Sequence, residues 1–597
     1  MKRSEIKEKD KWDLTKFFKT DKEYDETYNK VLDILNEIVK LKGHIVESAD
    51  NLYKYLTLDD DLSLYMERVY VYSYLYHFSD TNDNKGLLLK DKADKLEEKI
   101  NEETSFVRSE LLSVKYDYVK KLIKENKDLE KYAFALERMF RYEDHTLSKE
   151  EEQIISLASN AFGTPDDSFS ALDNADAKFG TIEVDGKEVE LTHSNYYKFL
   201  CNTDVKVRKD AFEKYYAFYA SHQNTLAEMY KGQVKEDLFM SKVRKFNSPL
   251  EASVYSDNIS VDVYNNLIET IHNNLNPLFD YFAFRKELFG LDEMHMYDLV
   301  VNYLKKKNTK VTFEEARDIV LEAVKPLGDE YVTDLKQAFT NRWIDIYPNE
   351  GKRSGAYQWG AYRVDPYVSM NFEGNDDSIS TMAHELGHAM HSYYSDRNQD
   401  ITYAQYPIFL AEIASTVNEV LLSEYLIENA KDDNEKLRHI LEFLDRFRAT
   451  VYRQTMFAEF EKKAHEMEQN GEALTPQALG DMYYELNKQY HGDGIINDEL
   501  IRYEWSRIPH FYTSFYVYKY ATGLCSAIAI ASDILEGKEG ARERYLQFLK
   551  SGSSDYPLEI LKACGVDMTS SEPVIKSIKF FEKKLEEAKK IVKKKVK

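Results

Sequence analysis

A histidine, a glutamate and a second histidine near the middle of the chain could together bind a metal ion and use it. The segment reads TMAHELGHAMH, with Glu385 next to His384 and His388 one helical turn further on. On a helix, histidines at this spacing lie about 40° apart around the axis, so their imidazoles can converge on one ion. Glu385 then reaches the ion's bound water as a general base, which is the HExxH arrangement. A half-buried helix with two hydrogen-bonded histidines is the alternative interpretation.

The next segment supplies a candidate for the third protein ligand that a catalytic zinc needs beside its open fourth position. It reads PIFLAEIASTVNE over residues 407–419, and its proline suits the first turn of a helix. Glu412 follows an apolar run, where an acid is either buried with a partner or bound to a cation. A surface carboxylate on an amphipathic helix is the alternative. Glu419 lies on the same helix face and is predicted to hold a ligand histidine in position.

His391 shares a helix stripe with His384 and competes with Glu412 as the third ligand. The two histidines would lie roughly 10 Å apart along the helix axis. Three nitrogens from one straight stripe cannot occupy three corners of a tetrahedron at about 2.1 Å from an ion. We therefore place His391 beside the ligands or in the packing, and prefer Glu412.

A tyrosine-rich segment near the C-terminus has residues that could stabilise an oxyanion. It reads RIPHFYTSFYVYKY and contains His510, Tyr512, Tyr516, Tyr518 and Tyr520. Zinc-assisted hydrolysis of a peptide bond develops negative charge on the scissile carbonyl oxygen, and neutral N–H or O–H donors aimed at that oxygen lower the barrier. Tyr516 and Tyr520 share a face if the segment is helical. An aromatic packing ridge is the alternative.

The elements that must position these residues are mostly helices. Glycine and proline are scarce, at 22 and 11 residues, as expected for long helices with few tight turns. Helical periodicity is clear in the stretches 23–41, 53–78 and 87–112. A division near residues 190–200 separates a helical N-terminal region, 1–195, from a larger catalytic region, 196–597.

Two segments have the composition of strands instead. TIEVDGKEVELT, residues 181–192, alternates around Asp185-Gly186 and predicts a β-hairpin at the end of the N-terminal region. GAYQWGAYRVDPYVSMNF, residues 355–372, is rich in β-formers and glycine and ends just before the metal motif. It predicts a small sheet beside the motif helix.

Composition argues against several partners and environments. The formal net charge of −24 over 597 residues repels nucleic-acid phosphate and anionic membranes. Three widely spaced cysteines fit a reducing cytosol rather than a disulfide framework. The N-terminus lacks an apolar stretch, so we do not expect it to be a secretory signal. The most apolar window, 524–535, is about half the roughly 20 residues of a membrane span, which predicts a buried helix.

The chain resembles oligoendopeptidase F, in the thimet-oligopeptidase family of zinc metallopeptidases. The resemblance covers almost the whole chain and rests on RSEIKEKDKWDLTKFF, FSALDNADAKF, SGAYQWGAY, MAHELGHAMH, FLAEIASTVNE and RIPHFYTSFYVYKYATG. It implies a mainly α fold of two lobes with a deep central channel and a small β-sheet beside the zinc-binding helix. The narrow channel implies oligopeptide substrates rather than folded proteins.

The resemblance also implies roles for individual residues. His384, His388 and Glu412 would hold one Zn²⁺ per chain, and Glu385 would be the general base. His510 would stabilise the tetrahedral intermediate together with Tyr516 or Tyr520. In the thimet branch the segment after this histidine is glycine-rich and its tyrosines are spaced differently, so Tyr512 and Tyr518 stay candidates as well.

The expected activity is hydrolysis of internal peptide bonds of short oligopeptides by attack of a zinc-bound water, with Glu385 moving the proton. The strand near Tyr367 to Phe372 would hold the substrate backbone extended by adding it as an edge strand. Tyr367 and Gly355 are the predicted substrate-binding residues. We expect a cytoplasmic protein, monomeric or weakly homo-oligomeric, with no nucleic-acid or membrane partner.

Two other functions fit parts of this pattern. A zinc carboxypeptidase with the same ligands would need a cation that grips the terminal carboxylate, and the candidates are Arg353, Arg363, Arg502 and Arg507. Surface or structural roles are the alternative for these arginines. A non-catalytic helical peptide-binding protein would bind no zinc, and the presence of HExxH with Glu412 and His510 argues against it.

Overall fold

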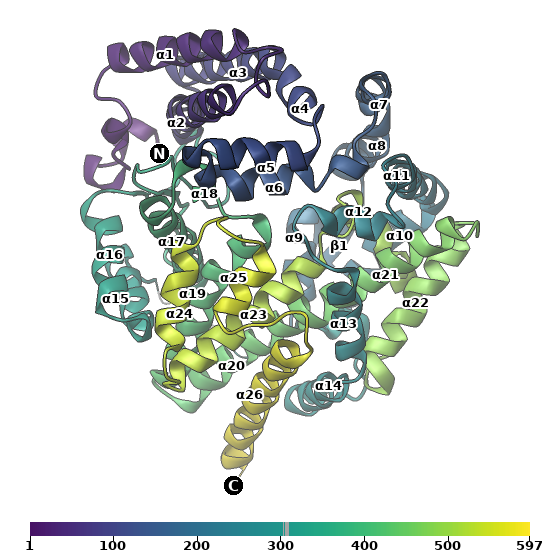
Figure 1. Cartoon of the computed structure of the whole chain (residues 1–597). Coiled ribbons are helices and arrows are strands. Elements are labelled where there is room, and N and C mark those ends of the chain that lie inside the picture. The colour runs from purple at the N-terminus through teal and green to yellow at the C-terminus, as the bar shows by residue number, and fades with distance from the viewer. Residues whose placement is uncertain (302–303, 305–309, 597) are drawn as a thin grey trace. The chain divides into compact units, whose positions relative to one another are not determined.

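The protein is described by a computed structural model that covers residues 1–301, 304 and 310–596 (Figure 1). Helices make up most of the described chain and the strands are short, so the prediction of a mainly α fold is confirmed. The chain divides into two compact units, each made of three segments: 1–146, 308–425 and 530–565 in the first, and 147–307, 426–529 and 566–597 in the second. The predicted division at residue 195 stays a prediction.

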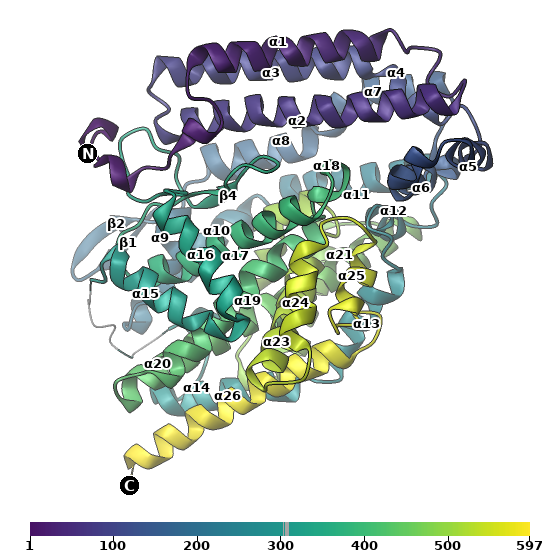
Figure 2. The ribbon, with the colours of Figure 1, turned by 60° about the vertical axis from the view of Figure 1, so that its left-hand side comes forward.

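The first unit begins with α1, α2 and α3, which lie side by side (Figures 1 and 2). Its elements are α1 Asp21–Val39, α2 Ala49–Ser79, α3 Asn84–Thr104, α4 Phe106–Leu111, α5 Tyr116–Glu125, α6 Ala133–Phe140, α15 Phe313–Ala323, α16 Asp329–Thr340, β3 Ile344–Asp345, β4 Tyr357–Trp359, β5 Tyr367–Ser369, α17 Asp376–Asn398, α18 Ile401–Ala404, most of α19 Ile408–Glu428, α24 Ala541–Lys550 and α25 Pro557–Ala563.

Side-chain caps fix where the first helices begin. Thr20, Ser48 and Asp83 precede α1, α2 and α3, and each side chain accepts a hydrogen bond from a backbone N–H group in the turn that follows. Such caps satisfy donors that have no partner within the helix. The three helices therefore start close to where the periodicity predicts them.

The helix predicted over 87–112 is interrupted, which the periodicity alone does not indicate. α3 ends at Thr104 and α4 begins at Phe106. At the break, the hydroxyls of Thr104 and Ser105 donate hydrogen bonds to the backbone carbonyls of Ile100 and Glu102. Serine and threonine side chains that bond back to the preceding turn bend helices, and two in succession here coincide with the end of α3.

The predicted small sheet has three strands in the order β3-β5-β4. β3 pairs with β5 in parallel and β4 pairs with β5 antiparallel. α17 packs against both β4 and β5, so the sheet lies beside the helix that carries the HExxH residues, as predicted. The ring of Tyr367 on β5 is fully buried against Trp12 and Phe17, which ties the sheet to the N-terminal segment of the same unit.

The second unit contains the predicted hairpin. β1 and β2 pair antiparallel around a two-residue turn in which Asp185 and Gly186 both have positive φ, at 51° and 75°. This is the backbone that Asp-Gly hairpin turns adopt, so the hairpin prediction is confirmed. The elements of the unit are α7 Lys149–Phe162, α8 Thr164–Ala171, β1 Thr181–Val184, β2 Lys187–Glu190, α9 His193–Leu200, α10 Val205–Ser221, α11 Gln223–Val243, α12 Pro249–Tyr255, α13 Val261–His272, α14 Asn276–Phe289, α20 Asp433–Phe447, α21 Arg453–Gln469, α22 Pro476–His491, most of α23 Tyr518–Leu535 and α26 Glu572–Val596.

The most apolar window of the sequence lies in α23, and most of its side chains are buried, as predicted. Within the described residues, no helix combines the length and the apolar character that crossing a bilayer requires. The last helix, α26, packs along α20 and α14 (Figure 2).

Candidate metal centre and surrounding residues

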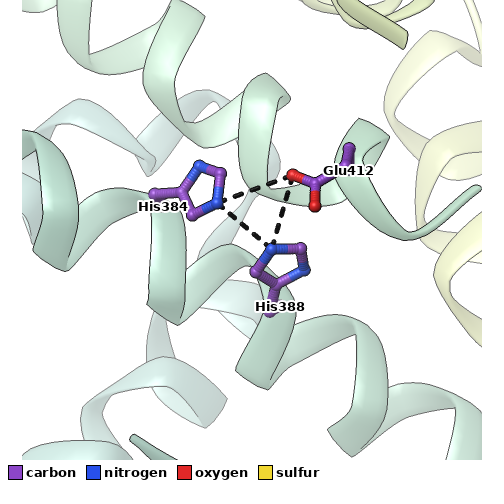
Figure 3. Close-up of side chains that lie close together, drawn as sticks. All are labelled: His384, His388 and Glu412. Atoms are coloured by element: carbon purple, nitrogen blue, oxygen red, sulfur yellow. Dashed lines mark hydrogen bonds and ion pairs between the residues drawn. The ribbon is translucent and has the colours of Figure 1, made fainter. Parts of the chain in front are cut away.

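Three side chains of the first unit meet at one point between α17 and α19 (Figure 3). The Nε2 atoms of His384 and His388 are 3.2 Å apart, and Oε2 of Glu412 lies 3.6 Å from each of them. Ligand atoms at about 2.1 Å from a tetrahedral ion are roughly 3.4 Å apart. Two imidazole nitrogens and one carboxylate oxygen at these separations fit one zinc ion, with the fourth position left for water or substrate.

Glu412 approaches the two histidines because α17 and α19 pack unusually closely. A Cβ atom added at Gly387 would lie 2.5 Å from the Cα of Ser415 and 2.8 Å from the carbonyl oxygen of Ala414. The buried amide of Asn418 donates a 3.1 Å hydrogen bond from α19 to the Ala383 carbonyl of α17. Spacing and composition do not mark Gly387, whereas the polar amide of Asn418 in the apolar run of α19 is a usable signal in the sequence.

We expect Gly387→Ala to lower the free energy of unfolding by about 1–3 kcal/mol, because added atoms in a close-packed contact force the backbone to shift. Thermal unfolding followed by circular dichroism measures the change. Gly523→Ala is the matched control: this glycine is also helical, and its added Cβ would meet no atom within 4 Å. The control is expected to be neutral or stabilising. Equal losses in both variants would contradict a tight contact at Gly387.

A hydrogen bond orients His384 with one nitrogen towards the shared point. Nδ1 of His384 donates a 2.9 Å hydrogen bond to Oε1 of Glu419, which leaves Nε2 with its lone pair directed at the site. Burial opposes protonation of His384, but the Glu419 carboxylate outweighs burial and raises the pKa of the ring. Burial and the neighbouring His384 lower the pKa of His388 to about 3. His388 is therefore neutral at physiological pH, the state in which imidazole binds metals.

Glu385 is buried beside this site, with 7% of its surface exposed. Burial raises the pKa of its carboxyl to about 7, and the charges of Glu412 and Glu419 add to the rise while His384 opposes it. A carboxyl group whose pKa is near the working pH can both accept and release a proton. Glu412 itself is more open, with 43% of its side chain exposed.

His391 lies in the packing rather than at the shared point. Its ring is 1% exposed and stacks on Tyr406 at a centroid distance of 3.6 Å, with Phe548 behind it. Burial lowers the pKa of His391 to about 3, so the ring is neutral. Of the two positions that sequence analysis left open for His391, the structure favours packing.

The expected substrate strand needs a correction. β5 is the central strand of the sheet, and β3 and β4 occupy its two edges. Tyr367 is fully buried, and its hydroxyl donates to the backbone carbonyl of Asp13. The strand around Tyr367 therefore cannot accept a further strand, and that prediction is wrong. β4 lies at the edge of the sheet, two residues after Gly355, whose carbonyl accepts a hydrogen bond from Asn371.

In the second unit, three of the residues predicted near the C-terminus gather into one aromatic group. Nε2 of His510 and the hydroxyl of Tyr520 are 3.0 Å apart and hydrogen bonded. The ring of Tyr516 lies 6.2 Å from His510 and 5.4 Å from Tyr520, measured between centroids. The helix begins only at Tyr518, so the condition under which Tyr516 and Tyr520 would share a helix face is not met. Phe515, with a φ of 61°, turns the chain just before Tyr516 instead.

The two other tyrosines of this segment pack against aromatic rings within the second unit. Tyr512 stacks on Phe169 at a centroid distance of 4.6 Å, and Tyr518 contacts Tyr264 at 5.0 Å. His510 is accessible at the surface, but partial burial of its ring and the nearby Arg453 charge lower its pKa. A neutral, accessible imidazole hydrogen bonded to a tyrosine hydroxyl can offer neutral donors to a developing oxyanion.

Each of the four arginines considered as binding residues for a terminal carboxylate contacts other side chains of the protein. Arg353 lies over the ring of Phe78, and Arg363 lies over that of Tyr362. Arg502 pairs with Asp481 and Glu499. Arg507 pairs with Glu504 and donates to the hydroxyl of Tyr216. These contacts fit the structural roles that sequence analysis gave as the alternative.

Comparison with known families matches two regions of the chain. Residues 199–580 match the sequence model of Peptidase family M3, which is more than half of the chain. Residues 110–179 match that of Oligopeptidase F. The metal-centre residues and the tyrosine-rich segment all fall within the first of these two regions.

Individual relatives align over nearly the full length. Oligopeptidase PepF of Bacillus subtilis is 43% identical over 586 residues, which cover 98% of this chain and 88% of that protein. Group B oligopeptidase PepB of Streptococcus agalactiae is 37% identical, with 99% and 98% covered. Among solved structures, oligoendopeptidase-F from Enterococcus faecium is 34% identical with a TM-score of 0.74, covering 96% of this chain and 99% of that one.

Proposed function

Because the chain belongs to peptidase family M3 and is a metalloendopeptidase, we propose that it hydrolyses internal bonds of short oligopeptides with one zinc ion per chain. The observation that carries the proposal is the meeting of His384, His388 and Glu412 with ligand atoms 3.2–3.6 Å apart. The names of the relatives, oligopeptidase and oligoendopeptidase, support short peptides as the substrates. The third interpretation considered from the sequence, a non-catalytic peptide-binding protein, does not fit this family.

The donor set favours zinc over harder cations. Two neutral imidazoles and one carboxylate are ligands that zinc accepts readily, whereas calcium and magnesium prefer oxygen ligands throughout. When bound, zinc acidifies water and polarises the substrate carbonyl. We assign Glu419 the role of holding His384, because its carboxylate accepts the Nδ1 proton of that ring.

We assign Glu385 the role of general base and then general acid. Its carboxyl is buried next to His384 and is not one of the three converging groups. With a pKa of about 7, this group can take a proton from the attacking water and return it to the leaving amine. Burial favours both transfers, because it keeps bulk water away from the carboxyl.

We propose that His510 and Tyr520, with Tyr516 beside them, stabilise the tetrahedral intermediate: Nε2–H of His510 donates to the Tyr520 hydroxyl, whose own O–H then donates to the oxyanion. Their mutual contacts support this role: the His510–Tyr520 hydrogen bond orients both groups, and His510 is kept neutral. Tyr512 and Tyr518 are better explained by packing against Phe169 and Tyr264.

We expect Tyr520→Phe to lower kcat about 100-fold, since the phenyl ring keeps the packing but removes a donor to the oxyanion. The KM and the zinc content should stay close to those of the wild type. Steady-state kinetics on a quenched peptide measure the effect. Tyr512→Phe is the control and should change kcat less than about twofold, because the ring stacked on Phe169 is preserved. A similar loss in both variants would contradict a specific role for Tyr520.

We propose that the substrate backbone adds to the edge of β4, next to Gly355, rather than to β5. This placement is supported by the strand order, which puts β4 at an edge, and by the packing of β4 on α17. An extended peptide along β4 would gain backbone hydrogen bonds without regard to its sequence. That fits an enzyme that accepts many short peptides.

The proposed activity is tested with an internally quenched peptide of about ten residues whose amino end is acetylated and whose carboxyl end is amidated. We expect cleavage at an internal bond, loss of cleavage with 1,10-phenanthroline, and recovery after zinc is returned. A carboxypeptidase would leave the blocked peptide intact and shorten the version with a free carboxyl end. That result would replace the endopeptidase proposal with the alternative.

A further inference from the structure

The second unit contains a partly open cavity of about 460 Å³ that is not part of the metal centre described above. Its walls come from α9, α10, α14, α21 and α22, from the π-helical turn Arg448–Tyr452 and from the 3₁₀ segment Glu499–Arg507. Pockets that bind small molecules in proteins have volumes of about 300–1,000 Å³. The cavity is therefore large enough for a compact ligand. Turns of π-helix within longer helices are frequent at functional sites.

Arg448 lines this cavity with its hydrogen-bonding capacity largely unused. The residue is 7% exposed, and its buried Nε has no hydrogen-bond partner among the residues that the structure describes. Its ion-pair partner is Asp445, at 3.8 Å from Nε to Oδ1, which is too long for a hydrogen bond. A guanidinium carries five N–H donors. A buried charge with so few partners is costly unless something binds it.

Asp445 cannot fully satisfy Arg448, because it already serves two other groups. Nη1 of Arg285 lies 3.2 Å and 3.0 Å from its two carboxylate oxygens. The hydroxyl of Tyr281 donates to Oδ1 at 2.7 Å. One carboxylate is thus shared by two buried guanidinium groups. Burial lowers the pKa of Arg448, and the charges of Arg285 and Arg453 add to the fall although Asp445 opposes it.

The acid that lines the cavity, Glu504, is also fully used. Glu504 accepts hydrogen bonds from Arg453 at 2.6 Å, Arg507 at 3.1 Å and Tyr216 at 3.0 Å. Burial opposes the negative charge, but Arg453 and Arg507 outweigh it and hold the pKa of Glu504 at about 2. Three arginines and one glutamate line the cavity, so the wall has an excess of positive charge.

A neutral histidine provides an acceptor on the same wall. Nδ1 of His491 donates a 2.8 Å hydrogen bond to the Asn487 carbonyl, so the lone pair is on Nε2. Burial lowers the pKa of His491 to about 4, and the ring stays neutral at physiological pH. Much of the remaining wall is apolar, including Leu200, Leu278 and Phe282. The cavity thus combines a positive anchor, a lone-pair acceptor and apolar surface.

We propose that this cavity binds the carboxylate of a small ligand with an apolar body, with Arg448 as the anchor of the carboxylate. Guanidinium groups bind carboxylates through paired, charge-assisted hydrogen bonds. His491 accepts an N–H of the ligand where one is present, and the apolar wall holds the body. N-acyl amino acids and the carboxyl ends of short peptides have all three features, and free apolar acids have two of them.

Isothermal titration calorimetry of the zinc-loaded protein tests the proposal. The probes are N-acetyl-L-phenylalanine and its carboxamide, which differ only in the carboxylate. We expect the acid to bind at least about 10-fold more tightly than the amide, as charge-assisted hydrogen bonds predict. Equal binding of the two probes would overturn the proposal. A third probe, 3-phenylpropionate, lacks the N–H group: binding as tight as that of N-acetyl-phenylalanine supports a free acid as the ligand, and much weaker binding supports a peptide carboxyl end.

Four variants locate the binding. Arg448→Met should weaken the binding of N-acetyl-L-phenylalanine at least about 10-fold. Ala449→Phe, which fills the cavity without changing any charge, should also weaken this binding. Arg438→Met is the matched control, since Arg438 pairs with Glu442 on α20 and does not line the cavity. Binding should persist in Glu412→Gln, which separates the cavity from the metal centre. Unchanged binding in both cavity variants, or its loss only in Glu412→Gln, would overturn the assignment.

Discussion

We expect Glu385→Gln to lower kcat by about 10³–10⁴-fold while the zinc content stays near one ion per chain. The amide occupies the same space as the carboxyl group but cannot accept a proton from water, and general bases contribute up to about this factor. Glu385 is not among the three groups that converge on the metal position, so zinc binding should survive. Turnover of a quenched peptide and metal analysis of the dialysed protein measure the two quantities.

Asp396→Asn is the matched control for this experiment. Asp396 is a second buried acid on α17, and burial raises its pKa to about 8, with Glu67 adding to the rise. Its carboxyl is thus mostly neutral at pH 7, and an amide replaces it closely. We expect kcat within about threefold of the wild type, as for a substitution that removes no group of the reaction. Near-normal turnover of Glu385→Gln would show that another residue moves the proton.

Glu412→Gln is expected to lower the affinity for zinc by at least about 100-fold, more than the loss of an outer partner of a ligand. The carboxylate supplies the one negative charge among the three converging groups, whereas the amide is neutral and a weaker ligand. Activity should fall with the metal and recover in part when zinc is added in excess. Titration against a chromophoric zinc chelator gives the affinity.

The zinc affinity of Glu419→Gln is the comparison for that of Glu412→Gln. Glu419 contacts Nδ1 of His384 and is not one of the three groups that converge. Its effect on zinc affinity should be intermediate, about 10- to 100-fold. The order wild type, Glu419→Gln, Glu412→Gln in falling affinity supports the assigned ligands. Wild-type zinc affinity in Glu412→Gln would exclude this glutamate as a ligand.

The sequence predicted local features well. The spacing of His384 and His388 brings their Nε2 atoms to 3.2 Å, because helix geometry alone fixes which residues share a face. The Asp185-Gly186 pair marks the hairpin turn, since these residues tolerate the positive φ that the turn requires. Both predictions depend on residues that are neighbours along the chain.

Predictions that depended on pairing or on the exact start of a helix were less successful. Alternation identifies a strand near Tyr367, but it does not say whether that strand is central or at an edge; the pairing with β3 and β4 makes it central. The i, i+4 spacing of Tyr516 and Tyr520 suggested one helix face. Phe515 instead adopts a positive φ, and its backbone N–H donates to Glu461, a residue far away in the sequence.

By itself the sequence determined the residue types, their helical spacing and the family, and these predict two histidines that can share a metal ion, with a glutamate beside them. The sequence also pointed to Glu412, but only the tertiary structure shows how it reaches those histidines, because the approach depends on the absence of a side chain at Gly387 opposite Ser415. The same holds for Arg448, whose shortage of partners arises from Arg285 and Tyr281 occupying Asp445. Spacing along one helix follows from backbone geometry, whereas contacts between helices depend on how distant side chains fill the same space.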